Sequence, residues 1–197
     1  MSGCKALILD AFETVVEKPV YHDLWREIIS LSGARCPDPM TSAMGVRDFA
    51  AACGVKCDPR WERELSEELT AMRLYPGVSE VLSECSNARV PVVIASNLAA
   101  PYGPRVQDLL GPDILYHFSF SSGRKKPDPQ FLVDACHKAG GSLDRSLFIG
   151  NSLRSDYACG RAAGIRTLLI VENGSWEPHE VSRADFGFEV KRFLKQP

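Results

Sequence analysis

Several polar side chains in this sequence directly follow short apolar runs, where their types could perform chemistry together. They are Asp10 after residues 6–9, Ser96 and Asn97 after residues 90–95, and Asn151 after residues 147–149. Lys126 precedes a Pro-Asp-Pro helix start, and Asp156 opens another predicted helix. A carboxylate can act as a nucleophile, and a lysine beside it can neutralise an anionic group. Each residue alone is typical of a turn or cap, but the combination favours a catalytic site.

The apolar runs have the length of buried strands and alternate with helical patterns. The runs are 6–9, 90–95, 118–120, 147–149 and 167–171, and the helical patterns are 77–87, 101–110, 129–139 and 155–163. This alternation predicts an α/β fold, with an open parallel sheet covered by helices on both faces. Because ligands bind beyond the carboxyl ends of such strands, the polar side chains above are expected to converge there.

Residues 16–75 break this rhythm and show no convincing strand. They contain three amphipathic helical stretches, 20–33, 42–54 and 58–72, the last beginning at the N-cap pair Asp58-Pro59. We therefore predict two units, an α/β core of residues 1–15 and 76–197 and an inserted helical lobe of residues 16–75. The return to the core is expected at 75–77.

Composition and charge exclude several classes of protein. The chain has 197 residues, 45% of them hydrophobic and 24% charged, with a net charge of −2. That composition suits a globular chain rather than a disordered one. The longest basic run, 124–126, is too short for a face that binds nucleic acid or an anionic membrane. No segment approaches the roughly 20 apolar residues of a membrane helix. We expect a cytoplasmic protein without nucleic-acid or membrane partners, and no pattern indicates its oligomeric state.

The seven cysteines are odd in number and irregularly spaced. This argues against a disulfide framework and predicts small buried thiols in a reducing compartment. Cys53 and Cys57 have no second pair and no nearby histidine, so no zinc site is expected there. The sequon at 173–175 is interpreted as a turn.

Four segments resemble the motifs of the haloacid dehalogenase (HAD) superfamily. Residues 7–16 (LILDAFETVV) are similar to its first motif, D-x-D-G-T after a strand, and 92–97 (VVIASN) to its second. Residues 126–131 (KPDPQF) resemble its lysine motif, and 150–156 (GNSLRSD) with 160–164 (GRAAG) its fourth. The resemblance spans most of the chain in the right order. It implies a Rossmann-like core and identifies 16–75 as a helical cap.

The resemblance also implies a role for each candidate residue. Asp10 would be the nucleophile, forming a covalent aspartyl intermediate. Lys126 would neutralise Asp10 and the transferring group. Ser96, with the N-terminus of the helix after it, would hold anionic oxygens of the substrate. Asn97 would also help to bind this anion. Asp156 would orient Lys126 or bind a metal.

Two positions depart from the family pattern. Phe12 stands where the family has the Asp that protonates the leaving group, help worth about 10²–10⁴ in rate. Glu13 is adjacent but is expected to point elsewhere. Asn151 stands where the family has a metal-ligating Asp. The family's metal positions are thus Asp10, Phe12, Asn151 and Asp156 here, which predicts weak Mg²⁺ binding at most.

Three functions follow as alternatives. The leading one is a HAD-type hydrolase with atypical or reduced activity on a small anionic substrate, a phosphate ester or acyl phosphate. The second is a 2-haloacid dehalogenase, because that branch has an aromatic residue two positions after the nucleophile. The third is a non-catalytic member that binds a ligand or a protein. Candidate halide ligands for the second alternative are Arg26, Arg35 and Arg47. Candidate cap contacts to the substrate are His22, Trp25, Arg26 and Arg47.

Overall fold

The computed structural model describes residues 4–172 and 177–196, so the turn predicted at 173–175 lies outside the described residues. The strands are β1 Leu7–Leu9, β2 Val16–Glu17, β3 Arg73–Leu74, β4 Val92–Ser96, β5 Leu115–Phe118, β6 Leu147–Gly150, β7 Arg166–Val171 and β8 Glu180–Ser182. The helices are α1 Leu24–Leu31, α2 Val46–Ala52, α3 Pro59–Ala71, α4 Val78–Asn87, α5 Tyr102–Leu110, α6 Ser119–Ser122, α7 Pro129–Lys138, α8 Ala158–Ala163 and α9 Phe186–Lys195. None of these helices is long and apolar enough to cross a membrane.

Six parallel strands form one sheet in the order β5-β4-β1-β6-β7-β8. The first strand lies at the centre, where Leu7 is in register with Val92 of β4 and Leu147 of β6. The chain moves from β1 to β4 on one side and reaches β6 on the other, so the strand order reverses at β1. A crevice at such a reversal is where open α/β sheets bind ligands. The predicted α/β class is confirmed.

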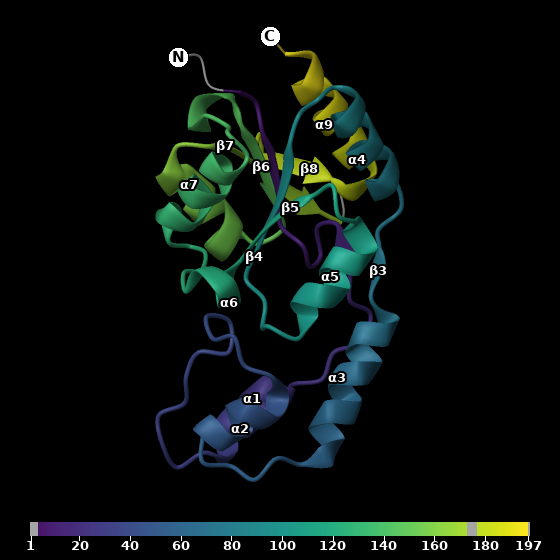
Figure 1. Ribbon diagram of the computed structural model, residues 1–197. Coiled ribbons are helices and arrows are strands. Elements are labelled where there is room, and N and C mark those ends of the chain that lie inside the picture. The colour runs from purple at the N-terminus through teal and green to yellow at the C-terminus, as the bar shows by residue number, and fades with distance from the viewer. Residues whose placement is uncertain (1–3, 173–176, 197) are drawn as a thin grey trace.

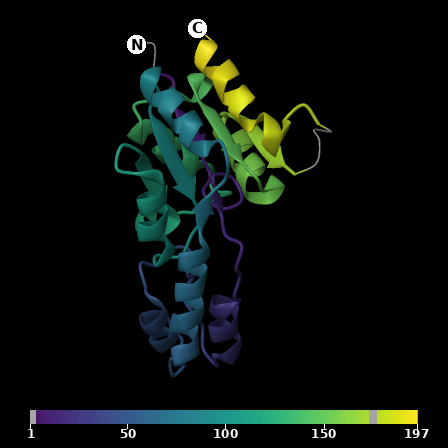
Figure 2. The same ribbon diagram turned by 90° about the vertical axis from the view of Figure 1, so that its right-hand side faces the viewer.

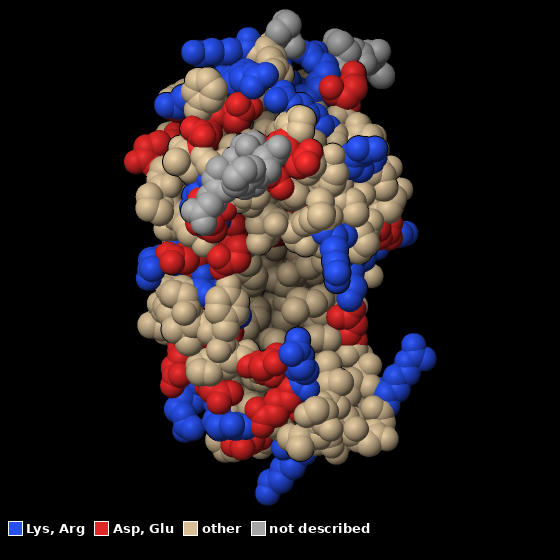
Figure 3. All heavy atoms as spheres, turned by 180° about the vertical axis from the view of Figure 1, so that it is seen from behind, with Lys and Arg blue, Asp and Glu red and all other residues tan. Residues whose placement is uncertain are grey.

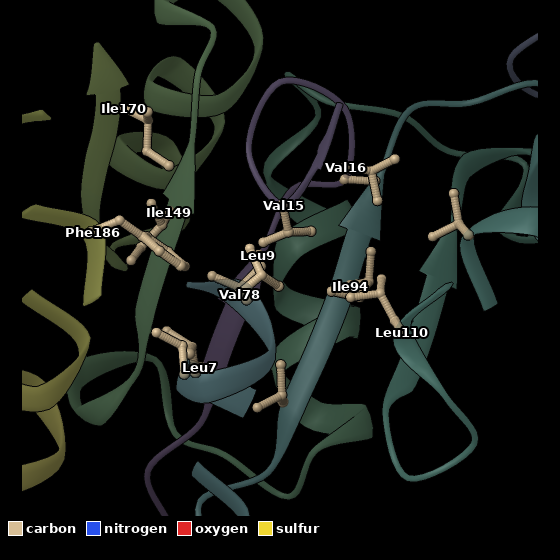
Figure 4. Close-up of a cluster of buried hydrophobic side chains, with 14 of the residues drawn as sticks. Leu7, Leu9, Val15, Val16, Val78, Ile94, Leu110, Ile149, Ile170 and Phe186 are labelled. Carbon is tan, nitrogen blue, oxygen red and sulfur yellow. The ribbon is translucent and has the colours of Figure 1, made fainter. Parts of the chain in front are cut away.

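Helices cover both faces of the sheet. The apolar side chains of β1 point alternately to the two faces, so both faces must be buried. Leu7 and Leu9 are buried on the face covered by α4, α5 and α9, and Figure 4 shows them beside Val78, Ile94 and Phe186. Ile8 is buried on the opposite face with α7 and α8. In Figure 1, α7 lies on one side of the sheet and α4 and α9 on the other. This two-sided burial holds the short central strand in place.

Helices α1, α2 and α3, which lie within residues 16–75, form a helical lobe with a small core of its own. That core contains Leu24 and Ile28 of α1, Phe49 of α2 and Trp61 of α3. Figure 2 shows these helices apart from the sheet. Helix α3 begins as expected, because the Asp58 side chain accepts a hydrogen bond from the Arg60 N–H with Pro59 at the first helical position.

Two short strands connect the lobe to the sheet, although the sequence pattern indicated no strand in 16–75. Val16 pairs with Leu74 and Glu17 with Arg73 in an antiparallel ribbon separate from the central sheet. Each strand has only two residues, which is too short for an alternating apolar pattern to reveal it.

The structure corrects two further expectations about secondary structure. The strand predicted at 118–120 is β5, which ends at Phe118, and residues 119–122 form the single turn α6 before Gly123. Gly123 adopts φ 70°, which ends that turn. Strand β8 and helix α9 were not predicted, because residues 180–195 show no distinct apolar run followed by a polar stop.

The expectation that all cysteines are thiols is wrong for one pair. Cys36 and Cys53 form a disulfide within the lobe, with their Cα atoms 4.8 Å apart. Their separation of 17 residues in the sequence did not indicate a disulfide. The two cysteines come together only because the loop before α2 folds back onto the end of that helix. The other described cysteines are free: Cys4, Cys57, Cys85, Cys136 and Cys159.

Candidate active site

Asp10 leaves the carboxyl end of the central strand and is buried at the middle of the sheet edge. Its backbone N–H donates to the carbonyl of Ile149 at 2.9 Å, so the β1–β6 pairing continues through it. Its carboxylate Oδ1 accepts a hydrogen bond from Lys126 Nζ at 2.6 Å, and the Ser96 hydroxyl also hydrogen-bonds to it. Only 7% of Asp10, 3% of Lys126 and 1% of Ser96 are exposed. Two of the predicted partners therefore contact this carboxylate.

The backbone of Lys126 is held by the side chain of Asn97. The Asn97 amide donates to the Lys126 carbonyl at 2.8 Å, and its oxygen accepts from the Lys126 N–H at 2.9 Å. Helix α7 then starts at Pro129 with Asp128 as its N-cap. Asn97 was predicted to help hold substrate, but both ends of its amide are engaged with Lys126. Its geometry is that of a positioning residue.

The second carboxylate, Asp156, is fully buried in a π-helical turn, Leu153–Tyr157, between β6 and α8. Its Oδ2 accepts the backbone N–H groups of Asn151 at 3.0 Å and Ser152 at 2.9 Å. Its Oδ1 lies 2.6 Å from Lys126 Nζ. Asp156 thus contacts the same Lys126 ammonium group as Asp10 does.

Gly150 lies directly against Asp156. A Cβ at position 150 would come within 2.5 Å of Asp156 Cγ. Gly150→Ala is therefore expected to displace Asp156 and lower the free energy of unfolding by about 1–3 kcal/mol, as overpacking of a tight interior does. Urea unfolding measures this. Gly33→Ala is the control, because a Cβ there meets no atom within 4 Å. Equal stability of the two variants would contradict the tight contact.

Electrostatics at the site follow from two carboxylates sharing one lysine. Burial raises the pKa of Asp10, the negative charge of Asp156 raises it further, and Lys126 opposes both. Burial alone would lower the pKa of Lys126, but Asp10 and Asp156 together raise it above the ordinary value. Lys126 is therefore held charged, whereas the ionisation of Asp10 is made harder.

The residues that follow Asp10 do not supply an acid to the site. The Phe12 ring packs edge-on against Tyr102, with ring centroids 5.5 Å apart. Glu13 adopts φ 56°, and its carboxylate accepts hydrogen bonds from the hydroxyls of Tyr21 and Tyr75, the latter at 2.7 Å. The Glu13 carboxylate is thus hydrogen-bonded to two tyrosines. This agrees with the expectation that it points elsewhere.

A pocket of about 430 Å³ lies between the sheet and the helical lobe. It borders the site, because Phe12 follows Asp10 closely and Asn97 and Leu98 follow Ser96 directly. Figure 3 shows the molecule hollowed between its two lobes, with mostly uncharged atoms in the hollow. Residues from both lobes line the pocket.

Three of the five cap residues singled out in the sequence line this pocket, namely His22, Trp25 and Arg26. The other two do not. Arg47 pairs with Glu62 on the surface of the lobe at 3.0 Å, and Arg35 is exposed. A cradle of three arginines around one halide is therefore not formed.

A buried polar cluster where the two lobes meet was not indicated by any sequence pattern. Lys18 Nζ lies 3.0 Å from Glu68 Oε2 of α3, and the Tyr102 hydroxyl of α5 donates to the same carboxylate. Lys18 also lies 4.2 Å from the ring centroid of Tyr21 and 5.1 Å from that of Tyr102. A lysine after the first strand and a glutamate on an amphipathic helix are ordinary surface residues in sequence, so only the fold reveals their pairing.

The donor set does not fit a tightly bound Mg²⁺. Of the four family metal positions, Phe12 offers no side-chain ligand and Asn151 is neutral. Asp156 uses one oxygen on Lys126 and the other on two backbone N–H groups. Within residues 4–172 and 177–196, no group of three or more His, Cys, Asp or Glu side chains could hold a metal ion. Mg²⁺ is usually held by one or two carboxylates with waters and substrate phosphates, so Asp10 as the single available carboxylate would support weak binding at most.

Known proteins resemble this chain in sequence and in fold. A phosphoglycolate phosphatase from Mesorhizobium japonicum is 30% identical over 103 residues, which cover 50% of this chain and 44% of that protein. The chain spans about half the length of the first curated relatives it matches.

Solved structures match over nearly the whole chain. A HAD phosphatase from Thermococcus onnurineus has a TM-score of 0.69 at 15% identity, covering 97% of this chain and 98% of that one. A 2-haloacid dehalogenase from Pseudomonas syringae has a TM-score of 0.67 at 17% identity, covering 96% and 98%. At such identities the likeness establishes the fold alone, and the fold is shared by both activities. The haloacid dehalogenase-like hydrolase family matches residues 4–164, well over half of the chain, and this chain therefore belongs to that family.

Proposed function

We propose that this protein hydrolyses a small phosphorylated substrate, with Asp10 as the nucleophile. The observation that carries the proposal is Lys126 Nζ, which lies 2.6 Å from both Asp10 Oδ1 and Asp156 Oδ1 at the centre of the sheet edge. A buried carboxylate beside a fixed ammonium group suits attack on an anionic phosphoryl group. The match to a curated phosphatase supports phosphorus rather than carbon as the centre attacked.

Each buried residue has a distinct part in this reaction. Asp10 attacks phosphorus, and Lys126 offsets the negative charge shared between the nucleophile and the phosphoryl oxygens. Asp156 keeps Lys126 charged and aimed, and Asn97 fixes the lysine backbone, so both are positioning residues. The Ser96 hydroxyl orients the Asp10 carboxylate. Residues 16–75 act as a cap that encloses the substrate in the pocket between the lobes.

Magnesium binds weakly at most in this proposal, because the donor set described above lacks a second available carboxylate. The site then carries two carboxylates against one lysine, so the substrate's own charge is balanced poorly. Slow turnover compared with family members that hold a full metal site is the expected consequence.

A dehalogenase activity is the second candidate, and Phe12 is the observation that favours it. A halide departs without taking a proton, so an aromatic residue at this position does not hinder displacement at carbon. The positions of the arginines argue against a dehalogenase, which needs cationic halide ligands. Arg47 is paired on the surface of the lobe, and Arg26 is largely exposed and pairs with Asp23.

An assay panel separates the candidates. The purified chain is incubated with phosphate monoesters and an acyl phosphate, with and without Mg²⁺, and with 2-chloropropionate in parallel. We expect release of inorganic phosphate that changes little on addition of EDTA, and no release of chloride. Chloride release without phosphate release would establish the dehalogenase. A folded protein that releases neither phosphate nor chloride in any assay would favour the third alternative, a non-catalytic member of the family that binds a ligand.

A further inference from the structure

Every proton-donating side chain around Asp10 in the described part of the chain already has a partner. Lys126 Nζ is shared between Asp10 and Asp156, lying 2.6 Å from a carboxylate oxygen of each. The amide of Asn97 is engaged with the Lys126 backbone, and the hydroxyl of Ser96 with Asp10. None of these groups stands ready to protonate an oxygen that departs from phosphorus.

The ionisable donors that line the pocket are engaged as well, and the unpartnered indole N–H of Trp25 does not titrate in the protein range. The hydroxyl of Tyr21 donates to Glu13, and that of Tyr102 donates to Glu68. Lys18 is paired with the same Glu68. Two further groups are paired near the rim, with His22 Nε2 3.1 Å from Glu67 and Arg26 3.1 Å from Asp23.

The rest of the pocket wall is apolar and largely aromatic. Phe12, Trp25 and Tyr102 contribute rings, and Met40 and Leu98 contribute aliphatic surface. A cavity of about 430 Å³ with such a lining suits a ring-sized apolar group rather than a short polar chain. Phe12, two residues after Asp10, belongs to this wall, as does Asn97, whose amide holds the Lys126 backbone.

We propose that the substrate is a phosphate joined to an aryl or acyl group, which leaves as a stabilised oxyanion without being protonated. This rests on the proposed function and specifies its leaving group. An alkoxide needs a proton from a general acid, help worth about 10²–10⁴ in rate, whereas a phenolate or carboxylate departs without one. The apolar pocket binds the organic part of that group.

The atoms balance in two steps. First, an oxygen of Asp10 bonds to phosphorus while the bond from phosphorus to the leaving oxygen breaks, and that oxygen keeps the electron pair as a phenolate or carboxylate. Second, water attacks phosphorus and the bond from phosphorus to Asp10 breaks. The products are inorganic phosphate, the regenerated Asp10 carboxylate and a proton released to solvent.

The test compares kcat/KM for substrates of similar size whose leaving groups differ in acidity. They are p-nitrophenyl phosphate, phenyl phosphate, benzoyl phosphate and benzyl phosphate, the last having an alkoxide leaving group. We expect kcat/KM to fall steeply as the leaving oxygen becomes more basic, with benzyl phosphate at least about 10²-fold below phenyl phosphate. The benzoyl and phenyl arms distinguish an acyl from an aryl substrate. Benzyl phosphate hydrolysed as fast as phenyl phosphate would overturn the leaving-group assignment alone.

Two variants examine the role of Phe12. Phe12→Asp introduces a carboxyl group able to protonate an alkoxide, so it should raise the rate with benzyl phosphate relative to p-nitrophenyl phosphate. Phe12→Leu keeps an apolar side chain and should preserve the wild-type order of substrates. Melting curves of both variants identify any that fail to fold, in which case the wild-type series decides. A folded Phe12→Leu that reverses the order would overturn the assignment.

A binding measurement keeps the two proposals distinguishable. Phenylphosphonate and methylphosphonate cannot be hydrolysed, and calorimetry gives their dissociation constants. We expect phenylphosphonate to bind at least about tenfold more tightly, a difference that burial of one ring readily supplies. Equal affinities would overturn the apolar pocket. If no substrate releases phosphate, the proposed function is overturned, whatever the phosphonates show.

Discussion

Replacing Asp10 by Asn should reduce phosphate release on the order of 10³-fold or more while leaving the fold intact. The amide is nearly the same size but is a poor nucleophile, so the covalent route is lost. Steady-state assays and circular dichroism of the purified variant measure both effects. Asp134→Asn is the control, because this carboxylate lies on α7 and accepts a hydrogen bond from Gln130 away from the site. Residual activity above about a tenth of wild type would place the nucleophile elsewhere.

The same substitution should not lower stability at neutral pH. Burial raises the pKa of Asp10, so the folded state binds the proton more tightly than the unfolded chain does. The resulting stabilisation is complete below the ordinary pKa range of Asp and is lost as pH rises through the raised pKa. Asp10→Asn removes this loss and leaves a neutral Lys126–Asp156 pair. Urea unfolding at several pH values should show that the free energy of unfolding of the variant increases relative to that of wild type as the pH rises.

Lys126→Met should have the largest effect on stability among the site variants. It leaves Asp10 and Asp156 buried without their shared counter-ion, which typically costs about 3–5 kcal/mol when a buried pair loses one member. Activity should be lost as well, because the phosphoryl charge is no longer offset. The difference from wild type should shrink in acid, because the pKa of Asp10 is raised by burial and its protonation removes one of the uncompensated charges.

The neighbouring lysine provides a matched control for that variant. Lys125 pairs with Asp38 near the surface, and its side chain is 45% exposed. Lys125→Met should therefore leave the unfolding transition and the turnover nearly unchanged, since exposed ion pairs contribute little. A loss of stability as large as that of Lys126→Met would contradict the distinction between the two sites.

The positions of the site residues along the chain could be predicted because parallel strands end at the same edge of a sheet. Asp10 and Ser96 each end a strand, and Asp156 follows a third, so their convergence requires only the correct sheet class. Lys126 was identified by its motif, and its contact with both carboxylates follows from the capped start of α7.

Side-chain direction and long-range polar pairing could not be predicted in this way. The direction of the Asn97 amide depends on the path of the loop that carries Lys126, 29 residues away in sequence. The partnership of Lys18 with Glu68 spans 50 residues and depends on how the two lobes pack. The Leu98 N–H donates to the Ser119 hydroxyl 21 residues away, so the loop after Ser96 is held by a contact that no local pattern indicates. Each of these features is set by tertiary structure rather than by local pattern.

Trapping the covalent intermediate tests the central claim most directly. The protein is mixed with p-nitrophenyl phosphate, quenched in acid during turnover and treated with borohydride, which reduces an acyl phosphate but leaves a free carboxylate unchanged. Mass spectrometry of the peptide containing residues 5–18 should then show homoserine at position 10, only in the sample given substrate. Homoserine at another aspartate, or unmodified Asp10 in a sample that is releasing phosphate, would contradict Asp10 as the nucleophile.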